Sequence, residues 1–274
     1  AAGLTNTLLD ALFVGGFGWG VAGAAIATGI SQCVGGLLPL FYFLRPNDSL
    51  LRLVRTKPEL APLVKACTNG SSELMSSISS SVVSMVYNFQ LLKYIGEDGV
   101  SAYGVLMYVQ FIFVAIYIGY SVGCAPVIGY HYGAGNRDEL KNLLRKSALL
   151  IGSAGVLLTL LARLLASPLA SIFVGYDETL HALTEHAFRL ISFSFLLSGF
   201  NIFTSAFFTA LNNGFVSAAI SFLRTLLFQT CCVLVLPVLF DIDGIWWAIT
   251  AAEVFAFAIS LTFLLTKRKK YGYM

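Results

Sequence analysis

Unbroken runs of twenty or more mostly apolar residues recur along this 274-residue chain, and they restrict its fold more than any other feature. A helix needs about 20 such residues to cross the hydrocarbon core of a bilayer, whereas the strands of a membrane barrel give only short alternating segments. Charged residues make up 11% of the chain, against about 25% in a typical soluble domain. The sequence therefore predicts an all-α, polytopic transmembrane helical bundle.

Turn-forming residues divide the chain into one short leading segment and seven full spans. Prolines cluster after the second segment, and the motifs GAGN at 133–136 and NNG at 212–214 mark later turns. The expected segments are Ala1–Val14, Trp19–Leu44, Val64–Ile95, Val100–Tyr132, Leu140–Leu165, Glu178–Leu211, Phe215–Phe240 and Gly244–Thr266.

The distribution of basic residues predicts the orientation of the bundle. Thirteen of the 17 Lys and Arg residues fall in the first long loop, around the GAGN loop or in the C-terminal tail. These three regions share one side if every span crosses once, and the opposite connections are acidic. By the positive-inside rule, the basic loops and the C-terminus of this multi-pass cell-membrane protein lie in the cytoplasm. The net charge of +3 gives no indication of nucleic-acid binding.

A weak internal repeat suggests two lobes. Residues 20–45 and 244–269 align at an offset of 224, and both run from the outer side to a basic end. Parallel repeats of this kind form the two lobes of many transporters. We therefore expect the end of a first lobe at 1–45, a cytoplasmic inter-lobe loop at 46–63, and a six-helix lobe with a basic cytoplasmic tail at 64–274.

Three stretches resemble one transporter family in order along the chain. NTLLDALFVGGFGWGVAGAAIAT at 6–28 resembles the junction of the fifth and sixth helices of the multidrug and toxic compound extrusion (MATE) family. Residues 102–147 resemble the eighth helix with its cytoplasmic loop, and residues 200–229 resemble the tenth and eleventh helices. The resemblance implies an N-terminally truncated family member that runs from the end of helix five to helix twelve.

The resemblance also implies a function and a coupling site. MATE transporters export organic cations and drugs in exchange for Na⁺ or H⁺, by alternating access of two six-helix lobes around a central cavity. In one branch, an Asn and an acidic residue of helix five form part of the cation or proton site, and Asn6 and Asp10 match these positions. Their spacing places them on one helix face, where amide and carboxylate oxygens suit a small cation. The alternative is that they only hydrogen-bond to a neighbouring helix.

Other polar residues inside the spans are candidates for the wall of a cavity. Glu73 lies among serines about two turns inside its span, and its alternative role is that of a helix-end carboxylate reaching the membrane surface. Glu185 and Arg189 are four residues apart, which favours a structural ion pair over a cavity role. The remaining candidate cavity or substrate residues are Tyr87, Asn88, Gln90 and Asn201, and for Asn201 an interhelical hydrogen bond is the favoured alternative.

Two charges of consecutive spans lie at similar depth. Arg224 follows Gly214 by ten residues, about 15 Å along a helix, and Glu253 follows Gly244 by nine residues from the opposite side, about 13–14 Å. In a hydrocarbon core of about 30 Å these two levels nearly coincide. We therefore expect an Arg224–Glu253 ion pair that holds the last two helices together.

Other classes of function find less support in the sequence. It contains no GxSxG or HExxH motif, the three His residues are not spaced like metal ligands, and the five Cys residues form no CxxC pair. It therefore indicates no enzyme, no cofactor and no metal beyond a possible Na⁺ at Asn6 and Asp10. A lipid-linked oligosaccharide flippase of the same superfamily would need several Arg residues facing a cavity, and only Arg189 and Arg224 lie deep in spans. The expected partners are organic cations, the coupling ion and the lipid bilayer.

Overall fold

The computed structural model describes residues 1–45 and 59–273, and these residues divide into two compact units, Ala1–Glu59 and Leu60–Met274. Helices make up both units, and no strand occurs in the described parts of the chain, which confirms the all-α prediction. Most of the expected inter-lobe loop lies outside the described residues. Its last residues are already helical, since the next helix begins at Leu60 and not at Val64. Pro62 fits there because the first turn of a helix has no acceptors for its N–H groups.

The first unit is a helical hairpin. Helix α1 (Ala2–Asp10) continues as the π-helix η1 (Ala11–Gly16), and α2 spans Gly20–Leu44. The chain reverses at Gly18 and Gly20, which both have positive φ angles and are therefore suited to glycine.

Small residues four apart on α2 make close packing in this hairpin possible. Gly23, Ala27 and Ser31 are buried, and a Cβ added at Gly35 would lie 3.0 Å from the Cβ of Ala2. Small side chains let the backbones of two membrane helices approach each other without the bulk of branched residues. Residues 6 and 10 of α1 are thereby held beside α2.

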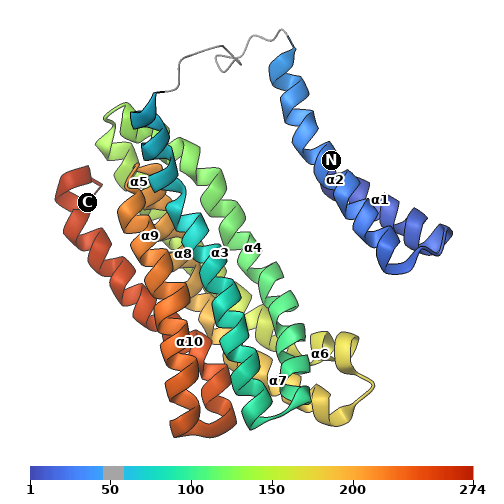
Figure 1. The fold of residues 1–274 in the computed structure, drawn as a ribbon. Coiled ribbons are helices and arrows are strands. Elements are labelled where there is room, and N and C mark those ends of the chain that lie inside the picture. The colour runs from blue at the N-terminus through green and yellow to red at the C-terminus, as the bar shows by residue number, and fades with distance from the viewer. Residues whose placement is uncertain (46–58, 274) are drawn as a thin grey trace. The chain divides into compact units, whose positions relative to one another are not determined.

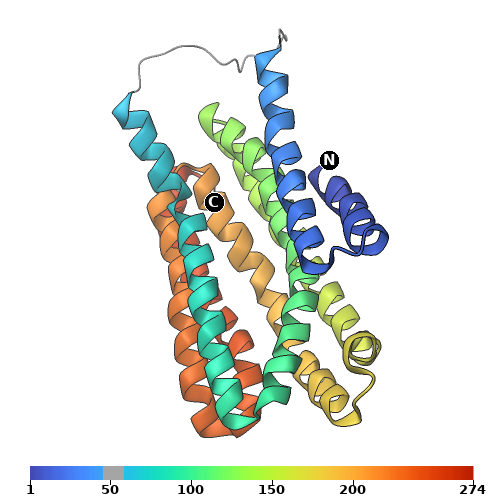
Figure 2. The ribbon, with the colours of Figure 1, turned by 45° about the vertical axis from the view of Figure 1, so that its right-hand side comes forward.

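The second unit is a bundle of long helices (Figure 1). Its elements are α3 (Leu60–Tyr94), α4 (Glu97–Gly133), α5 (Arg137–Leu164), α6 (Ala166–Val174), α7 (Glu178–Ile191), the 3₁₀ turn η2 (Ser192–Ser194), α8 (Phe195–Ala210), α9 (Gly214–Phe222), the π-helix η3 (Leu223–Phe228) and α10 (Gln229–Tyr271). Figure 2 shows α3 lying along the helical rod formed by α9, η3 and the first part of α10. The turns at 133–136 and 212–214 and the C-terminus belong to one end of this unit, here called the basic end.

The last helical element contains a reversal of the chain. Phe240 and Asp241 have non-helical backbone angles, with φ of 50° at Asp241. A Cβ added at Gly244 would lie 2.3 Å from the carbonyl oxygen of Leu236, so the two arms of the reversal touch at this glycine. The two arms correspond to the predicted spans Phe215–Phe240 and Gly244–Thr266. The short helix α6 was not predicted, and it occupies the connection between the predicted spans that end at Leu165 and begin at Glu178.

Five stretches in the described parts are long and apolar enough to cross a membrane: Gly20–Leu44, Glu97–Gly133, Arg137–Leu164, Glu178–Ala210 and Gly214–Tyr271. The last contains the reversal and so covers two predicted spans. The expected span Val64–Ile95 is helical and long enough, but it is absent from this set because the serines of α3 make its middle too polar.

Candidate functional site

Asn6 and Asp10 lie one turn apart on α1, at the point where the α-helix gives way to the π-helix η1. The Asn6 side-chain amide donates a long hydrogen bond of 3.4 Å to the Thr28 hydroxyl of α2, and Thr28 donates to the carbonyl of Ala24. Oδ1 of Asp10 is shielded from solvent and has no hydrogen-bond partner among the described residues. An unpartnered buried carboxylate oxygen is costly in a membrane helix, and π-turns are frequent at functional sites. One oxygen of the Asp10 carboxylate is therefore left without a hydrogen bond inside this hairpin.

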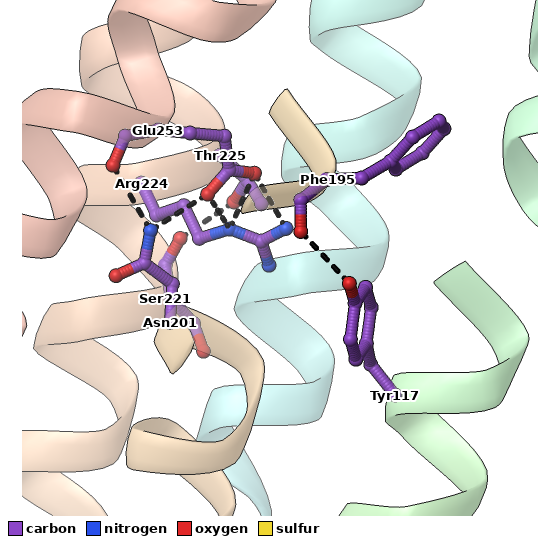
Figure 3. A network of polar contacts seen from close by, with 7 residues as sticks. All are labelled: Tyr117, Phe195, Asn201, Ser221, Arg224, Thr225 and Glu253. Carbon is purple, nitrogen blue, oxygen red and sulfur yellow. Dashed lines mark hydrogen bonds and ion pairs between the residues drawn. The ribbon is translucent and has the colours of Figure 1, made fainter. Parts of the chain in front are cut away.

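The structure brings Arg224 and Glu253 together, with Asn201 as a third member (Figure 3). Arg224 donates from Nη2 to Oε1 of Glu253 at 2.7 Å, and from Nε to Oε1 and Oε2 at 3.0 and 3.1 Å. Asn201 donates from Nδ2 to Oε2 of Glu253 at 2.7 Å and to the Glu253 carbonyl at 3.1 Å. The carboxylate thus accepts hydrogen bonds from both η3 and α8.

Burial decides what this three-residue network can do. The side chain of Glu253 is 5% exposed and that of Arg224 is 20% exposed, while Asn201 is fully buried. A buried charge pair is stable only when hydrogen bonds replace the lost water, and here they do. Asn201 therefore forms hydrogen bonds across helices, from α8 to α10.

Hydroxyl groups form a cluster between α8 and α9. The Ser205 hydroxyl lies 2.9 Å from that of Ser217 and 3.0 Å from that of Ser221, and Thr209 lies 2.7 Å from Ser217. Such contacts join membrane helices through small polar side chains. No spacing rule within one helix could have identified this cluster, because its bonds cross from α8 to α9.

A polar stripe runs along the exposed face of α3. Glu73, Ser77, Ser81 and Asn88 are exposed and Ser84 is half-buried, and their spacings of three or four residues place them on one face. The stripe from Glu73 to Asn88 is about 23 Å long. Ser81 bonds back to the carbonyl of Ser77 at 3.3 Å, but neither Glu73 nor Asn88 has a hydrogen-bond or ion-pair partner within the described parts of the chain. A stripe with two unpaired polar groups is suited to water and not to lipid tails.

The other polar and aromatic candidates on α3 separate by burial. Tyr87 is buried and stacks on Tyr103, with ring centroids 5.0 Å apart, and Gln90 is buried as well. Asn88 is exposed and contributes to a shallow hollow of about 490 Å³ at the end opposite the basic end. Of these three candidates, only Asn88 is accessible to a ligand.

Glu185 and Arg189 form the expected pair within α7, with the guanidinium Nη2 bonded to Oε1 of Glu185. The Arg189 side chain is half exposed. Nε2 of His186, the residue that follows Glu185, lies 2.8 Å from Oδ1 of Asp243 at the reversal of α10. The His186–Asp243 contact was not predicted, because 57 residues separate its partners and neither stands in a recognisable motif.

The described residues include no group of three or more His, Cys, Asp or Glu side chains that could hold a metal ion. All five cysteines are unpaired. The chemistry available in the described residues is thus that of isolated carboxylates, amides and hydroxyls.

Comparisons with known proteins agree on one family. The family model MatE matches residues 74–233. The Multidrug export protein MepA of Staphylococcus saprophyticus is 26% identical over 278 residues, covering 98% of this chain and 59% of that protein. The Staphylococcus aureus protein of the same name is 24% identical over 250 residues, covering 90% of this chain and 54% of that protein. This chain therefore spans less than two thirds of the length of these relatives.

Solved structures match the whole of the described fold. An outward-facing multidrug resistance MATE family transporter of the MOP superfamily superposes with a TM-score of 0.90 at 20% identity, over 100% of this chain and 62% of that one. A MATE protein in complex with MaL6 gives a TM-score of 0.88 at 21% identity, over 99% of this chain and 61% of that one. At such identities the likeness establishes the fold.

Proposed function

The chain belongs to the MATE family of multi-pass membrane transporters, and on this premise we propose that it takes part in exporting organic cations in exchange for Na⁺ or H⁺. Residues 1–45 would end the first lobe and residues 64–274 would form the second, with the C-terminus in the cytoplasm. The relatives named above are called multidrug export proteins, which supports drug efflux as the activity of the complete transporter.

The polar stripe of α3 carries this proposal. A helix in contact with lipid on its whole outer face would have no reason to expose a carboxylate and an amide without partners. The neighbouring exposed stripe, which includes Leu74, Ile78 and Phe89, is apolar and suits lipid or an apolar part of a substrate. A water-filled path bounded by the second unit accounts for the polar stripe.

Glu73 lies near the basic end of that stripe. A Cβ added at Gly214, the first residue of α9, would lie 2.2 Å from the carbonyl oxygen of Thr68, so Thr68 marks the level at which α9 begins. Glu73 follows Thr68 by five residues, about 8 Å along α3. In the proposed orientation it is the one carboxylate of the α3 stripe, and it lies at the end of the stripe nearest the cytoplasm.

Asn6 and Asp10 are proposed as the coupling site. The unpartnered Oδ1 of Asp10 and the weak, replaceable hydrogen bond of Asn6 support this role. A small cation or a proton at Asp10 would compensate a charge that the hairpin itself leaves unpaired. The alternative flippase function has less support, because Arg224 is committed to Glu253 and Arg189 to Glu185.

Efflux of a cationic dye tests the proposed function. Cells that lack their own drug exporters and express the complete gene should retain less ethidium than cells with the empty vector. A protonophore should abolish the difference if protons drive export, and replacement of Na⁺ by choline should abolish it if Na⁺ does. Equal ethidium retention in the two kinds of cell would contradict the proposed function.

Glu73→Gln should weaken the export of cations in particular. Loss of a charge-assisted contact contributes about 1.5–3 kcal/mol, so the ethidium concentration for half-maximal export should rise about tenfold or more. Export of an uncharged substrate should stay unchanged. Glu178→Gln is the matched control, since Glu178 is an exposed carboxylate in the first turn of α7. A similar change in both variants, or none in either, would exclude Glu73 from the substrate path.

A further inference from the structure

Two basic segments far apart in the chain meet at the basic end of the second unit. One is the start of α5, with Arg137, Lys141, Arg145 and Lys146, and the other is the end of α10, with the run 267–270. These eight residues are called the basic collar below. All are exposed except Lys267, which is half-buried.

The C-terminal tail joins the two segments. The Tyr273 side chain is 0% exposed, its ring packs 5.2 Å from that of Phe207, and its hydroxyl donates to the Leu264 carbonyl at 3.0 Å. Asn213, just before α9, donates from Nδ2 to the Tyr271 hydroxyl at 2.9 Å. The end of the chain is therefore packed against α8 and the turn before α9.

Gly272 is the point of contact between the segments. It adopts a left-handed conformation with φ of 69°, and its N–H donates to the carbonyl of Arg268 at 2.8 Å. A Cβ at this position would lie 2.6 Å from Cδ of Arg137, so the Arg137 side chain passes directly over the glycine. The start of α5 and the last turn of α10 are thus neighbours.

The collar is poorly neutralised by the protein itself. Its own stretches contain two acidic residues, Asp138 and Glu139, and Glu139 accepts hydrogen bonds from Asn142. None of the eight basic side chains forms an ion pair with another residue in the parts of the chain that are described. Like charges that are held together repel one another. Anions bound from solvent or lipid would reduce this repulsion.

The position of the collar favours one class of anion. On both helices, exposed apolar residues begin within one turn of the charges, as Leu149 does after Lys146 and Leu265 does before Lys267. The collar therefore lies where water meets hydrocarbon, at the level of lipid phosphates. The surface of an anionic leaflet attracts such clusters by about 1 kcal/mol per basic residue, which is about fivefold in affinity.

We propose that the basic collar is a binding site for the phosphate groups of anionic phospholipids in the adjacent leaflet. The positive-inside rule accounts for basic residues in these loops, but it does not require the tail to fold back and hold the two segments together. The site is separate from the proposed substrate path along α3. A lipid bound there would stabilise the contacts that join the start of α5, the end of α10 and the tail.

Lipid retention by the purified protein tests this site. The product of the complete gene, in detergent with equimolar phosphatidylglycerol and phosphatidylcholine, should retain phosphatidylglycerol preferentially in native mass spectrometry. Arg145→Gln and Lys269→Gln should each reduce that preference about fivefold, and Lys269→Arg should preserve it. Lys93→Gln removes an exposed lysine at the opposite end of α3 and should have no effect.

A tail variant tests whether the preference for phosphatidylglycerol requires the assembled collar or only its charges. Tyr273→Ala keeps every charge but removes the ring that anchors the tail, so it too should lower the preference for phosphatidylglycerol. Melting temperatures of all variants show whether each protein remains folded. Equal retention of the two lipids by the unaltered protein, or an unchanged preference in the two glutamine variants, would overturn the proposal. Complete displacement of lipid by inorganic phosphate at equal concentration would also overturn it, by identifying a site for free phosphate.

Discussion

Asp10→Asn, introduced into the complete gene, should abolish ion-driven dye export while the protein still reaches the membrane in normal amounts. The substitution keeps the shape of the side chain and removes the charge that would bind a cation or a proton. Initial rates of ethidium efflux under an imposed ion gradient measure the effect, and they should fall to the level of vector cells. Asp98→Asn, which changes an exposed carboxylate in the first turn of α4, is the matched control.

Thr28→Val distinguishes coupling from simple helix contact at the same place. If export depended only on the Asn6–Thr28 contact between α1 and α2, removing the Thr28 hydroxyl should lower export as Asp10→Asn does. The bond is long, at 3.4 Å, so we expect a loss of at most about 1 kcal/mol in stability and continued export. Ion-dependent export of normal rate in Asp10→Asn would exclude Asp10 from the mechanism.

The second large effect is expected at the buried charge pair of the last two spans. Arg224→Leu should lower the free energy of unfolding by about 3–5 kcal/mol, because Glu253 would keep its charge with only the Asn201 amide to compensate it. The double variant Arg224→Leu with Glu253→Leu should recover most of the loss, since neither charge remains. The exchange of the two residues should recover part of it. Folded yield and melting temperature in detergent provide the measurement.

Arg189→Leu is the matched control for that substitution. Its partner Glu185 lies on the same helix and the Arg189 side chain is half exposed, so solvent can replace the lost contact. We expect a change of less than about 1 kcal/mol. Equal melting temperatures for Arg224→Leu and the unaltered protein, or a double variant whose defect is the sum of the single defects, would show that the charges do not stabilise each other.

The boundaries of the fold followed from local rules. Apolar length and turn residues predict most helix ends to within a few residues, and depth along two helices is enough to pair Arg224 with Glu253. Asn201 could not be joined to this pair in the same way. Its partner depends on how α8 rotates about its axis, and rotation is decided by packing across the whole bundle.

The burial of single side chains and the docking of the tail could not be predicted from the sequence for the same reason, because both depend on tertiary contacts. The predicted cavity residues Tyr87 and Gln90 carry polar groups in a polar region of α3, yet they face the interior because of where α3 meets its neighbours. The docked tail likewise depends on the rings of Phe207 and Phe208, more than sixty residues away from Tyr273.

The hydroxyl cluster between α8 and α9 differs from the Glu253 network in its redundancy. The Ser205 hydroxyl has three acceptors within reach, the hydroxyls of Ser217 and Ser221 and the Ser217 carbonyl at 3.3 Å. If one serine is replaced by alanine, the remaining hydroxyls can turn to another partner and leave no buried donor unpaired. The charge on Glu253 has no such substitute. The serines of this interface can therefore be substituted one at a time during evolution, whereas a substitution at Arg224 or Glu253 must be matched by one at the other residue.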